Sequence, residues 1–279
     1  MSKTVSLINM KGGVGKTTLA ANLAASASVR GKSVLVVDID PQANASVYLL
    51  GQADYTQFLQ SGARCIIDIF EQFTPVAISR TAIGRLTISD VAQSPRHWWT
   101  AGHRLDVISF RLELAWTLKN PSGKEHLLSR FLQREASDYD LVLIDCPPTE
   151  SMFTTAAYLA SDYVLVPVVP EFIPAIGFPL LARSLDEFKA QYDKDVQIAG
   201  IVFNSTTDDY SEHDTTKGEV IAEAANNDWY VFEHEIGYSR SYPRGPRAAT
   251  PIFLTDYARY SVEQEFRDVA TEFFGRIGL

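Results

Sequence analysis

Residues 11–18 (KGGVGKTT) combine the residue types that bind the phosphate groups of a nucleotide. Glycines let the backbone curl until successive N–H groups point at one anion, and a helix that begins directly after the loop adds its positive end. Lys16 is spaced to reach the β and γ phosphates, and the Thr17 hydroxyl is placed to bind Mg²⁺. We therefore predict a nucleoside triphosphate site formed by Gly12, Gly13, Val14, Gly15, Lys16, Thr17 and Thr18.

The loop departs from the strict pattern G-x-x-x-x-G-K-[ST], because Met10 stands where that pattern has its first glycine. Instead, a second lysine, Lys11, precedes the glycine pair. Lys11 has no obvious role within its own chain if Lys16 already serves the phosphates. An apolar strand pattern before the loop and a helical pattern after it argue against a chance glycine-rich turn.

Further polar side chains follow apolar runs along the chain. These positions are Asp38 and Asp40, Asp145, and Asn204. Aspartate and asparagine also favour ordinary turns and strand-end caps, so each position has a purely structural interpretation as well. In a doubly wound sheet, however, functional residues collect at the carboxyl ends of the strands, where the phosphate loop also begins.

Apolar runs and helical periodicities alternate along the chain. Strands are expected at 4–9, 33–37, 105–109, 141–144, 163–169 and 198–203, with shorter candidates at 86–89 and 230–233. Helices are expected at 19–29, 66–73, 124–135, 152–160, 178–191, 215–226 and 258–274. This alternation predicts one α/β domain over residues 1–279, a doubly wound and mostly parallel β-sheet flanked by helices, as in P-loop NTPases. Residues 52–120 are the least regular part.

Composition limits the kind of protein. The chain is 46% hydrophobic and 21% charged, as in ordinary soluble globular proteins, and no apolar run reaches the roughly 18 residues of a membrane span. We see no signal peptide at the N-terminus and expect a cytoplasmic protein. Cys65 and Cys146 form no CxxC pair, which argues against a disulfide framework or a zinc site. Cys146 is expected to be a small buried residue rather than a nucleophile.

Together these segments resemble the ParA/MinD superfamily of deviant Walker A ATPases. The lysine-bearing loop is similar to the deviant Walker A motif, and residues 38–44 (DIDPQAN) resemble the D-x-D-P-Q-x-N segment of the ParA branch. Residues 141–148 (LVLIDCPP) resemble the family's Walker B strand, and residues 163–171 (YVLVPVVPE) a further family segment. The resemblance covers most of the chain and is weakest over residues 52–120.

The resemblance implies ATP and Mg²⁺ as cofactors and assigns roles to individual residues. Lys11 would be the signature lysine that reaches across an ATP-bound homodimer to the partner's phosphates, where negative charge develops during phosphoryl transfer. Asp40 would orient or activate the attacking water, and Asn204 would contact adenine. The implied catalytic residues are thus Lys11, Lys16 and Asp40. The implied metal-site residues are Thr17, Asp38 and Asp145, the last of these through water.

Within the superfamily we favour a ParA-like ATPase that positions or segregates cargo. A MinD-like membrane switch needs an amphipathic terminal helix with a basic face, whereas the phenylalanines of 271–279 continue the apolar stripe of the preceding helix. Iron–sulfur carriers of the superfamily use paired cysteines, and bacterial tyrosine kinases carry a tyrosine cluster in the tail. The chain supplies neither convincingly, since its last tyrosine is Tyr260.

DNA is an expected partner although the net charge of −9 opposes it, because a local basic patch persists inside an acidic total. The candidate residues are Arg240, Arg244 and Arg247 in a predicted loop that also holds Tyr242. They could equally serve solvation or salt bridges, or part of the loop could lie against adenine. If they are not the DNA contacts, Arg183, Arg259 and Arg267 are the next candidates.

Other partners follow from the resemblance. It implies a ParB-like or cargo adaptor protein that stimulates hydrolysis, and a location on the nucleoid. The phosphate loop begins at residue 11 with no helix-turn-helix before it, so we do not expect operator-specific repression. The sequence does not indicate the cargo.

Overall fold

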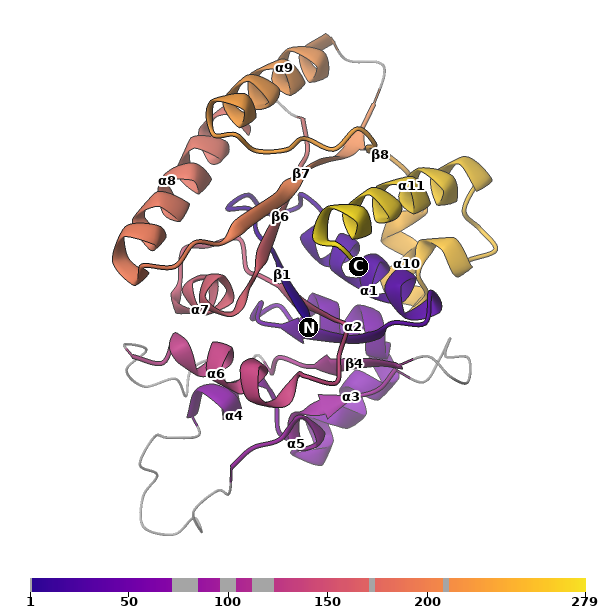
Figure 1. The fold of residues 1–279 in the computed structure, drawn as a ribbon. Coiled ribbons are helices and arrows are strands. Elements are labelled where there is room, and N and C mark those ends of the chain that lie inside the picture. The colour runs from indigo at the N-terminus through magenta and orange to yellow at the C-terminus, as the bar shows by residue number, and fades with distance from the viewer. Residues whose placement is uncertain (1, 72–84, 96–103, 112–122, 171–173, 208–210) are drawn as a thin grey trace.

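A β-sheet of eight described strands runs through the centre of the chain (Figure 1). The computed structural model describes residues 2–71, 85–95, 104–111, 123–170, 174–207 and 211–279. The strands are β1 (Lys3–Leu7), β2 (Ser33–Asp38), β3 (Ala92–Gln93), β4 (Arg104–Ile108), β5 (Leu141–Asp145), β6 (Tyr163–Val168), β7 (Gln197–Thr206) and β8 (Ile236–Gly237). Their order is β3-β4-β2-β5-β1-β6-β7-β8, and of these pairs only β3 and β4 are antiparallel.

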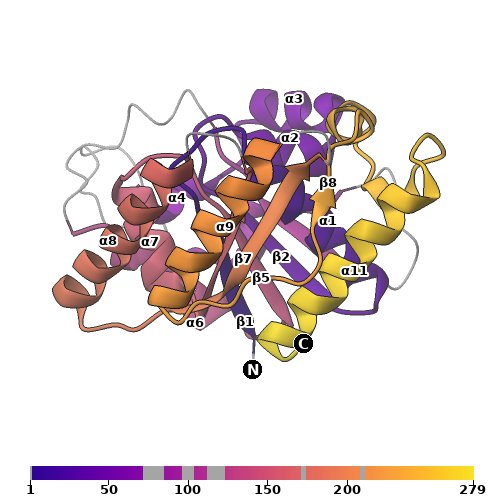
Figure 2. The ribbon, with the colours of Figure 1, turned by 90° about the horizontal axis from the view of Figure 1, so that it is seen from above.

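Helices cover both faces of this sheet. They are α1 (Lys16–Val29), α2 (Asn44–Leu50), α3 (Gln52–Ser61), α4 (Ile66–Glu71), α5 (Ile88–Val91), α6 (His126–Glu135), α7 (Met152–Ala160), α8 (Pro174–Tyr192), α9 (Ser211–Asn226), α10 (Gly245–Ala248) and α11 (Tyr260–Ile277), with short 3₁₀ turns η2 (Tyr242–Arg244) and η3 (Ile252–Leu254). Figures 1 and 2 show α1 and α11 on one face and α7 and α8 on the other. The predicted fold class is confirmed.

Residue types explain why α1 lies at the centre. Its sequence KTTLAANLAASASV is rich in alanine, and most of its side chains are buried. Small side chains let the helix pack against the strands on one side while α2 and α11 pack on the other. The central strands are buried along their length, as expected for parallel strands covered on both faces.

The prediction of a strand at 86–89 is wrong. Thr87 and Asp90 form a capping box, in which each side chain accepts from the other residue's backbone N–H, and this starts α5 at Ile88. The edge strand β3 begins only afterwards, at Ala92. The helix expected at 66–73 is present from Ile66 to Glu71, and its last two expected residues lie outside the described part of the chain.

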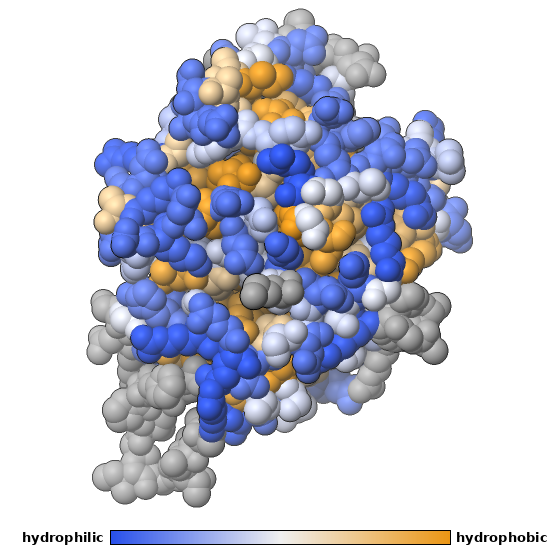
Figure 3. Space-filling model, viewed as in Figure 1, coloured by the Kyte–Doolittle hydropathy of each residue, from blue (hydrophilic) through white to orange (hydrophobic). Residues whose placement is uncertain are grey.

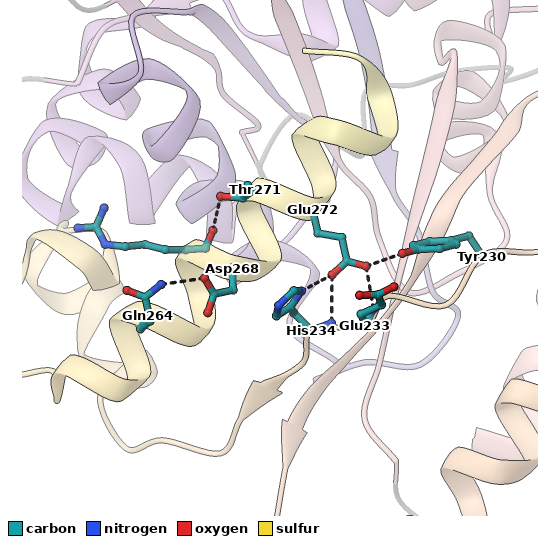
Figure 4. Close-up of polar contacts among 8 residues, drawn as sticks. Tyr230, Glu233, His234, Gln264, Asp268, Thr271 and Glu272 are labelled. Atoms are coloured by element: carbon teal, nitrogen blue, oxygen red, sulfur yellow. Dashed lines mark hydrogen bonds and ion pairs between the residues drawn. The ribbon is translucent and has the colours of Figure 1, made fainter.

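The short strand expected at 230–233 is also absent. One isolated bridge pairs Ile201 with Val231, and the Phe232 N–H donates to the Ile201 carbonyl over 2.8 Å, but the two backbone N–H groups that follow turn away from the sheet. Those of Glu233 and His234 donate to the Glu272 carboxylate of α11 over 2.7 and 3.0 Å, and the Tyr230 hydroxyl and the His234 ring also contact it (Figure 4). A carboxylate 38 residues away thus ends the pairing that the apolar pattern suggested.

The arginine-bearing segment 239–247, expected to be a loop, is partly helical. Residues 242–244 form η2 and residues 245–248 form α10. Pro243 and Pro246 each lie in the first turn, where their missing N–H costs no helical hydrogen bond. Helices α2 and α3 were not predicted from the sequence. The remaining predicted strands and helices are present within a few residues of their expected ends.

Candidate functional site

The phosphate loop lies between the end of β1 and the start of α1, as predicted. Gly13 and Gly15 have φ angles of 79° and 94°, which are left-handed conformations that glycine adopts without strain. A Cβ atom on Gly15 would overlap the side-chain amide nitrogen of Asn204. Gly15 is also the N-cap residue of α1, so the positive end of a buried helix faces the centre of the loop.

Lys16 is held inside the loop rather than in solvent. Its side chain is buried, and its ammonium group donates to the carbonyl oxygens of Asn9 over 2.9 Å and Lys11 over 3.1 Å. Burial lowers the pKa of Lys16, while the nearby carboxylates of Asp145 and Asp40 oppose that shift. The Asn9 side chain accepts from the Lys11 N–H over 2.8 Å. The loop therefore places a cation where it can contact phosphates.

Thr17 and Asp145 form the part of the site that suits a metal ion. The Thr17 hydroxyl donates to Asp145 Oδ2 over 2.7 Å. The other carboxylate oxygen, Oδ1, is buried and has no hydrogen-bond partner among the described residues. Burial and the neighbouring Asp38 raise the pKa of Asp145 well above its ordinary value, so a cation at this carboxylate would relieve an unfavourable charge.

These donors fit Mg²⁺, which at phosphate sites is bound by one or two protein oxygens together with phosphates and water. In the part of the chain that the structure describes, no cluster of three or more His, Cys, Asp or Glu side chains could hold a metal alone.

Asp38 lies opposite Asp145 in the β2–β5 ladder, but its hydrogen bonds point toward α2. Its Oδ2 accepts from the Ser46 N–H over 2.8 Å and from the Ser46 hydroxyl over 2.7 Å, and its Oδ1 accepts from the Asp40 N–H over 3.2 Å. Complete burial raises the pKa of Asp38 to about 7 despite these bonds. Asp38 therefore anchors the start of α2, and its predicted metal role stays a prediction.

Asp40 lies at the mouth of the same strand end, 7% exposed. Its Oδ1 accepts from the Gln42 N–H over 2.9 Å, and its carbonyl accepts from the Ala43 N–H over 2.8 Å. Ala43 has a φ of 54°, a left-handed conformation that costs a non-glycine residue of the order of 1 kcal/mol or more. Such strained positions cluster at segments that rearrange with a ligand, and this one lies between Asp40 and α2.

Asn204 lies within β7 rather than at its end, and it braces the phosphate loop. Its side-chain amide donates to the Val14 carbonyl over 2.8 Å. Its predicted contact with adenine stays a prediction. Cys146 is fully buried beside Asp145, which confirms that it is a small buried residue, and burial raises the pKa of its thiol.

The loop adjoins an open cleft of about 440 Å³. Residues 148–150, which follow Asp145 and Cys146, form one wall, and Arg183 and Glu187 of α8 form the other. Met10, which precedes Lys11 in the chain, borders the cleft.

Of the candidate DNA-contact arginines, Arg244 lies on η2 and Arg247 on α10, and Arg240 precedes η2. Arg240, Arg244 and Arg247 are exposed, and none of them forms an ion pair with another described residue. Arg244 instead lies over the Tyr257 ring, 4.2 Å from its centroid. Arg267 similarly lies over Phe253, whereas Arg183 pairs with Glu187 over 2.7 Å. Arg183 thus differs from Arg240, Arg244, Arg247 and Arg267 in having a carboxylate partner among the described residues.

The family described as AAA domain matches residues 2–198. The chain is 32% identical to the sporulation initiation inhibitor protein Soj of Bacillus subtilis over 206 residues, which is 72% of each chain. It is 29% identical to the chromosome-partitioning ATPase Soj of Treponema pallidum, over 73% of this chain and 71% of that one. Both relatives are matched over less than the full chain.

Solved structures extend the likeness in fold to nearly the whole chain. A plasmid partition protein of Borrelia burgdorferi bound to AMPPNP has a TM-score of 0.74 at 20% identity and covers 99% of this chain and 100% of its own. Apo McdA of Cyanothece has a TM-score of 0.77 at 18% identity, with coverages of 98% and 99%. Cobyrinic acid a,c-diamide synthase of Mycobacterium smegmatis, bound to ADP and magnesium, has a TM-score of 0.67 at 22% identity, with coverages of 89% and 91%.

The deviant phosphate loop, the carboxylates at the ends of β2 and β5, and these relatives all agree with the resemblance read from the motifs. The chain belongs to the AAA-domain family, as a Soj/ParA-like member of the ParA/MinD superfamily of ATPases.

Proposed function

We propose that this chain is a ParA-like ATPase whose ATP-bound form is a sandwich homodimer that binds DNA without sequence preference. Hydrolysis, stimulated by a ParB-like or cargo adaptor protein, would release the dimer and so drive segregation or positioning of a DNA or protein cargo. The observation that carries the proposal is the convergence of Lys16, Thr17 and the unpartnered Asp145 oxygen beside a loop that holds a second lysine, Lys11.

ATP with Mg²⁺ is the ligand that this arrangement suits. Backbone N–H groups and Lys16 would hold the phosphates, and Thr17 and Asp145 would hold the metal, which neutralises charge developing on the phosphates. Asp40 would orient the attacking water. The AMPPNP bound to the Borrelia partition protein supports this proposal by analogy of fold.

The position of Lys11 supports the proposed dimer. Lys16 already occupies the interior of the loop, while Lys11 is half-buried and follows Met10, which borders the cleft. A lysine there is suited to the phosphates of a second copy, where its charge would stabilise phosphoryl transfer. A partner seated on this face would complete the site.

DNA binding is supported by Arg240, Arg244 and Arg247, which lie on or just before η2 and α10. A guanidinium stacked on an aromatic ring, as Arg244 is on Tyr257, keeps its N–H edge available for phosphates. Three arginines per chain give six in a dimer, and six phosphate contacts imply a log–log salt slope of about −5. The nucleoid within the cytoplasm would then be the place of action.

The MinD-like membrane alternative has less support. The apolar stripe of α11 is used in the core, where Phe266, Phe273 and Phe274 are buried. Hydrophobic areas on the face in Figure 3 are small and separated by hydrophilic residues. Among the described residues, no helix combines the length and apolar character needed to cross a bilayer.

Light scattering tests the dimer. The chain should double in mass with ATP and not with ADP, and Lys11→Ala should abolish both the ATP-dependent dimer and hydrolysis while still binding nucleotide as a monomer. Lys32→Ala, which removes a lysine outside the loop, is the matched control. Equal mass with ATP and with ADP would refute the proposed switch.

Fluorescence anisotropy with random-sequence duplex DNA tests the second half of the proposal. Replacing Arg240, Arg244 and Arg247 by alanine should abolish the steep salt dependence, whereas Arg183→Ala should have little effect because that arginine is paired with Glu187. Unchanged binding by the triple variant would move the surface elsewhere, with Arg259 and Arg267 next. An absence of binding in every nucleotide state would refute a DNA-binding function.

A further inference from the structure

A buried polar side chain joins the phosphate-loop helix to the segment that follows the arginines. Asn22 of α1 is fully buried. Its amide group donates to the Thr18 carbonyl over 2.8 Å and contacts the Tyr48 hydroxyl over 3.0 Å, and its Oδ1 accepts from the Ile252 N–H over 2.7 Å. One asparagine therefore connects the first turn of α1, helix α2 and the start of η3.

Tyr48 of α2 contacts the arginine-bearing segment directly. Its side chain is 2% exposed, and its hydroxyl also donates to the Thr250 carbonyl over 3.5 Å. A Cβ atom on Gly245 would overlap the Tyr48 hydroxyl oxygen. Gly245 is the first residue of α10 and lies between Arg244 and Arg247. The backbone that carries these arginines thus packs directly against the Tyr48 ring, at a distance that leaves no room for a side chain at position 245.

The other side of α2 belongs to the nucleotide site. Ser46, two residues before Tyr48, donates its N–H and its hydroxyl to Asp38. The helix begins at Asn44, directly after the left-handed Ala43 and the Asp40 turn. A helix of seven residues moves as one unit, so a rearrangement at Asp40–Ala43 also displaces Tyr48.

We propose that Tyr48, supported by Asn22, is a positioning residue that transmits the nucleotide state of the site to residues 245–252. A triphosphate and a diphosphate differ at the γ position, next to the Asp38–Ala43 segment in the proposed function on which this inference rests. A shift of α2 would change the fit of the Tyr48 hydroxyl against Gly245 and Thr250, and with it the placement of Arg244 and Arg247. The nucleotide would thereby control the phosphate-binding surface within one chain, in addition to any effect of dimerisation.

Hydrogen exchange of the backbone amides in residues 240–254 tests this coupling without requiring DNA. In the parent chain, exchange in these residues should differ between the AMPPNP-bound and ADP-bound states by at least about fivefold, the lower end of usual coupling between sites. Tyr48→Phe, which removes one hydroxyl, should reduce the difference to less than about twofold. Its affinity for both nucleotides should stay within about twofold of the parent.

Two further variants separate coupling from a general loss of packing. Tyr55→Phe is the matched control, because it removes another buried tyrosine hydroxyl, one that donates to the Phe110 carbonyl over 2.8 Å, and should leave the difference intact. Gly245→Ala perturbs the contact between Gly245 and the Tyr48 hydroxyl from the other side. It should reduce the difference in exchange between the AMPPNP-bound and ADP-bound states, as Tyr48→Phe does.

The outcomes that would overturn the inference are distinct from those that bear on DNA. Equal exchange of residues 240–254 with AMPPNP and with ADP in the parent, or a difference that persists in Tyr48→Phe, would refute it. Nucleotide-dependent exchange that is lost in Tyr48→Phe but kept in Tyr55→Phe would support it, even if the anisotropy titration found no DNA binding. A parent chain that bound neither nucleotide would refute the proposed function and this inference together.

Discussion

Replacing Asp38 by asparagine should change how the stability of the nucleotide-free chain depends on pH. Asp38 is fully buried at the end of β2, and burial raises its pKa from 3.8 to about 7. The folded chain therefore holds this proton more tightly than the unfolded chain. Stability is then lost as the pH rises from about 4 to about 7, because folding must bury a charge that the unfolded chain leaves in water.

The size of the effect follows from the shift. A rise from 3.8 to about 7 corresponds to about 4 kcal/mol when the group is fully ionised, and about 3 kcal/mol of this develops between pH 5 and pH 8. Asparagine keeps one oxygen for the two Ser46 donors but presents an amide to the Asp40 N–H. That mismatch costs about 1 kcal/mol at every pH. Asp145 faces Asp38 across the ladder, so the two carboxylates titrate as a pair.

Urea unfolding at pH 5 and pH 8 measures this directly. Relative to the parent, Asp38→Asn should gain about 3 kcal/mol between the two pH values and become the more stable protein at pH 8. Asp195→Asn, at a side chain that is 75% exposed, is the control, and its stability should equal that of the parent at both pH values. If Asp38→Asn and the parent lost or gained stability in parallel, the buried Asp38 carboxylate would not carry the ionisation penalty, and the argument would fail.

Further substitutions should separate the steps at the nucleotide site and test the anchoring of α11. Asp40→Ala should bind ATP normally but hydrolyse it at least about 100-fold more slowly, as measured by phosphate release, because in the proposed function Asp40 orients the attacking water and does not contact the phosphates. Turnover at the parent rate would contradict that role. Lys16→Ala should instead weaken ATP binding itself, as measured by calorimetry, and an unchanged affinity would place the phosphates elsewhere. Glu272→Gln should destabilise the chain by about 2 kcal/mol at pH 7. Burial works against a low pKa at Glu272, but the donors on Glu233, His234 and Tyr230 outweigh it and hold the pKa below 4.5. The stability lost in Glu272→Gln, measured by urea unfolding, should therefore shrink as the pH falls below that value. A loss of stability that stayed constant down to pH 3 would contradict this.

The sequence predicted the features that depend on local residue types. The phosphate loop needs glycines, a lysine and a threonine at fixed spacing, and the central strands need continuous apolar runs, so both could be recognised without the structure. The carboxylates could be placed near the loop because the ends of parallel strands meet there. The hydrogen bond between Thr17 and Asp145 could not be predicted, because it joins residues 128 positions apart in the chain.

Helix α2 shows why some elements escaped prediction. It begins after Ala43 in a left-handed conformation usually marked by glycine, and its N-terminal N–H is satisfied by Asp38, eight residues upstream of Ser46. Neither feature forms a local pattern. In the same way, Glu272 ends the strand pairing near His234 from 38 residues away. Long-range polar contacts decided these elements, whereas local propensity decided the others.

An acidic total is compatible with the proposed basic surface, because several carboxylates of residues 231–279 are engaged elsewhere. Residues 231–279 contain six arginines, and none of them forms an ion pair with another described residue. Glu235 pairs with Lys217, Glu272 contacts His234, and Glu265 accepts from the Gly237 N–H. The nearest partners of several arginines are aromatic rings, which leave the positive charge unneutralised. In the proposed function, phosphates at this surface would meet arginines that form no ion pair with a described residue, while the net charge of −9 would oppose rebinding once the contacts are halved in a monomer.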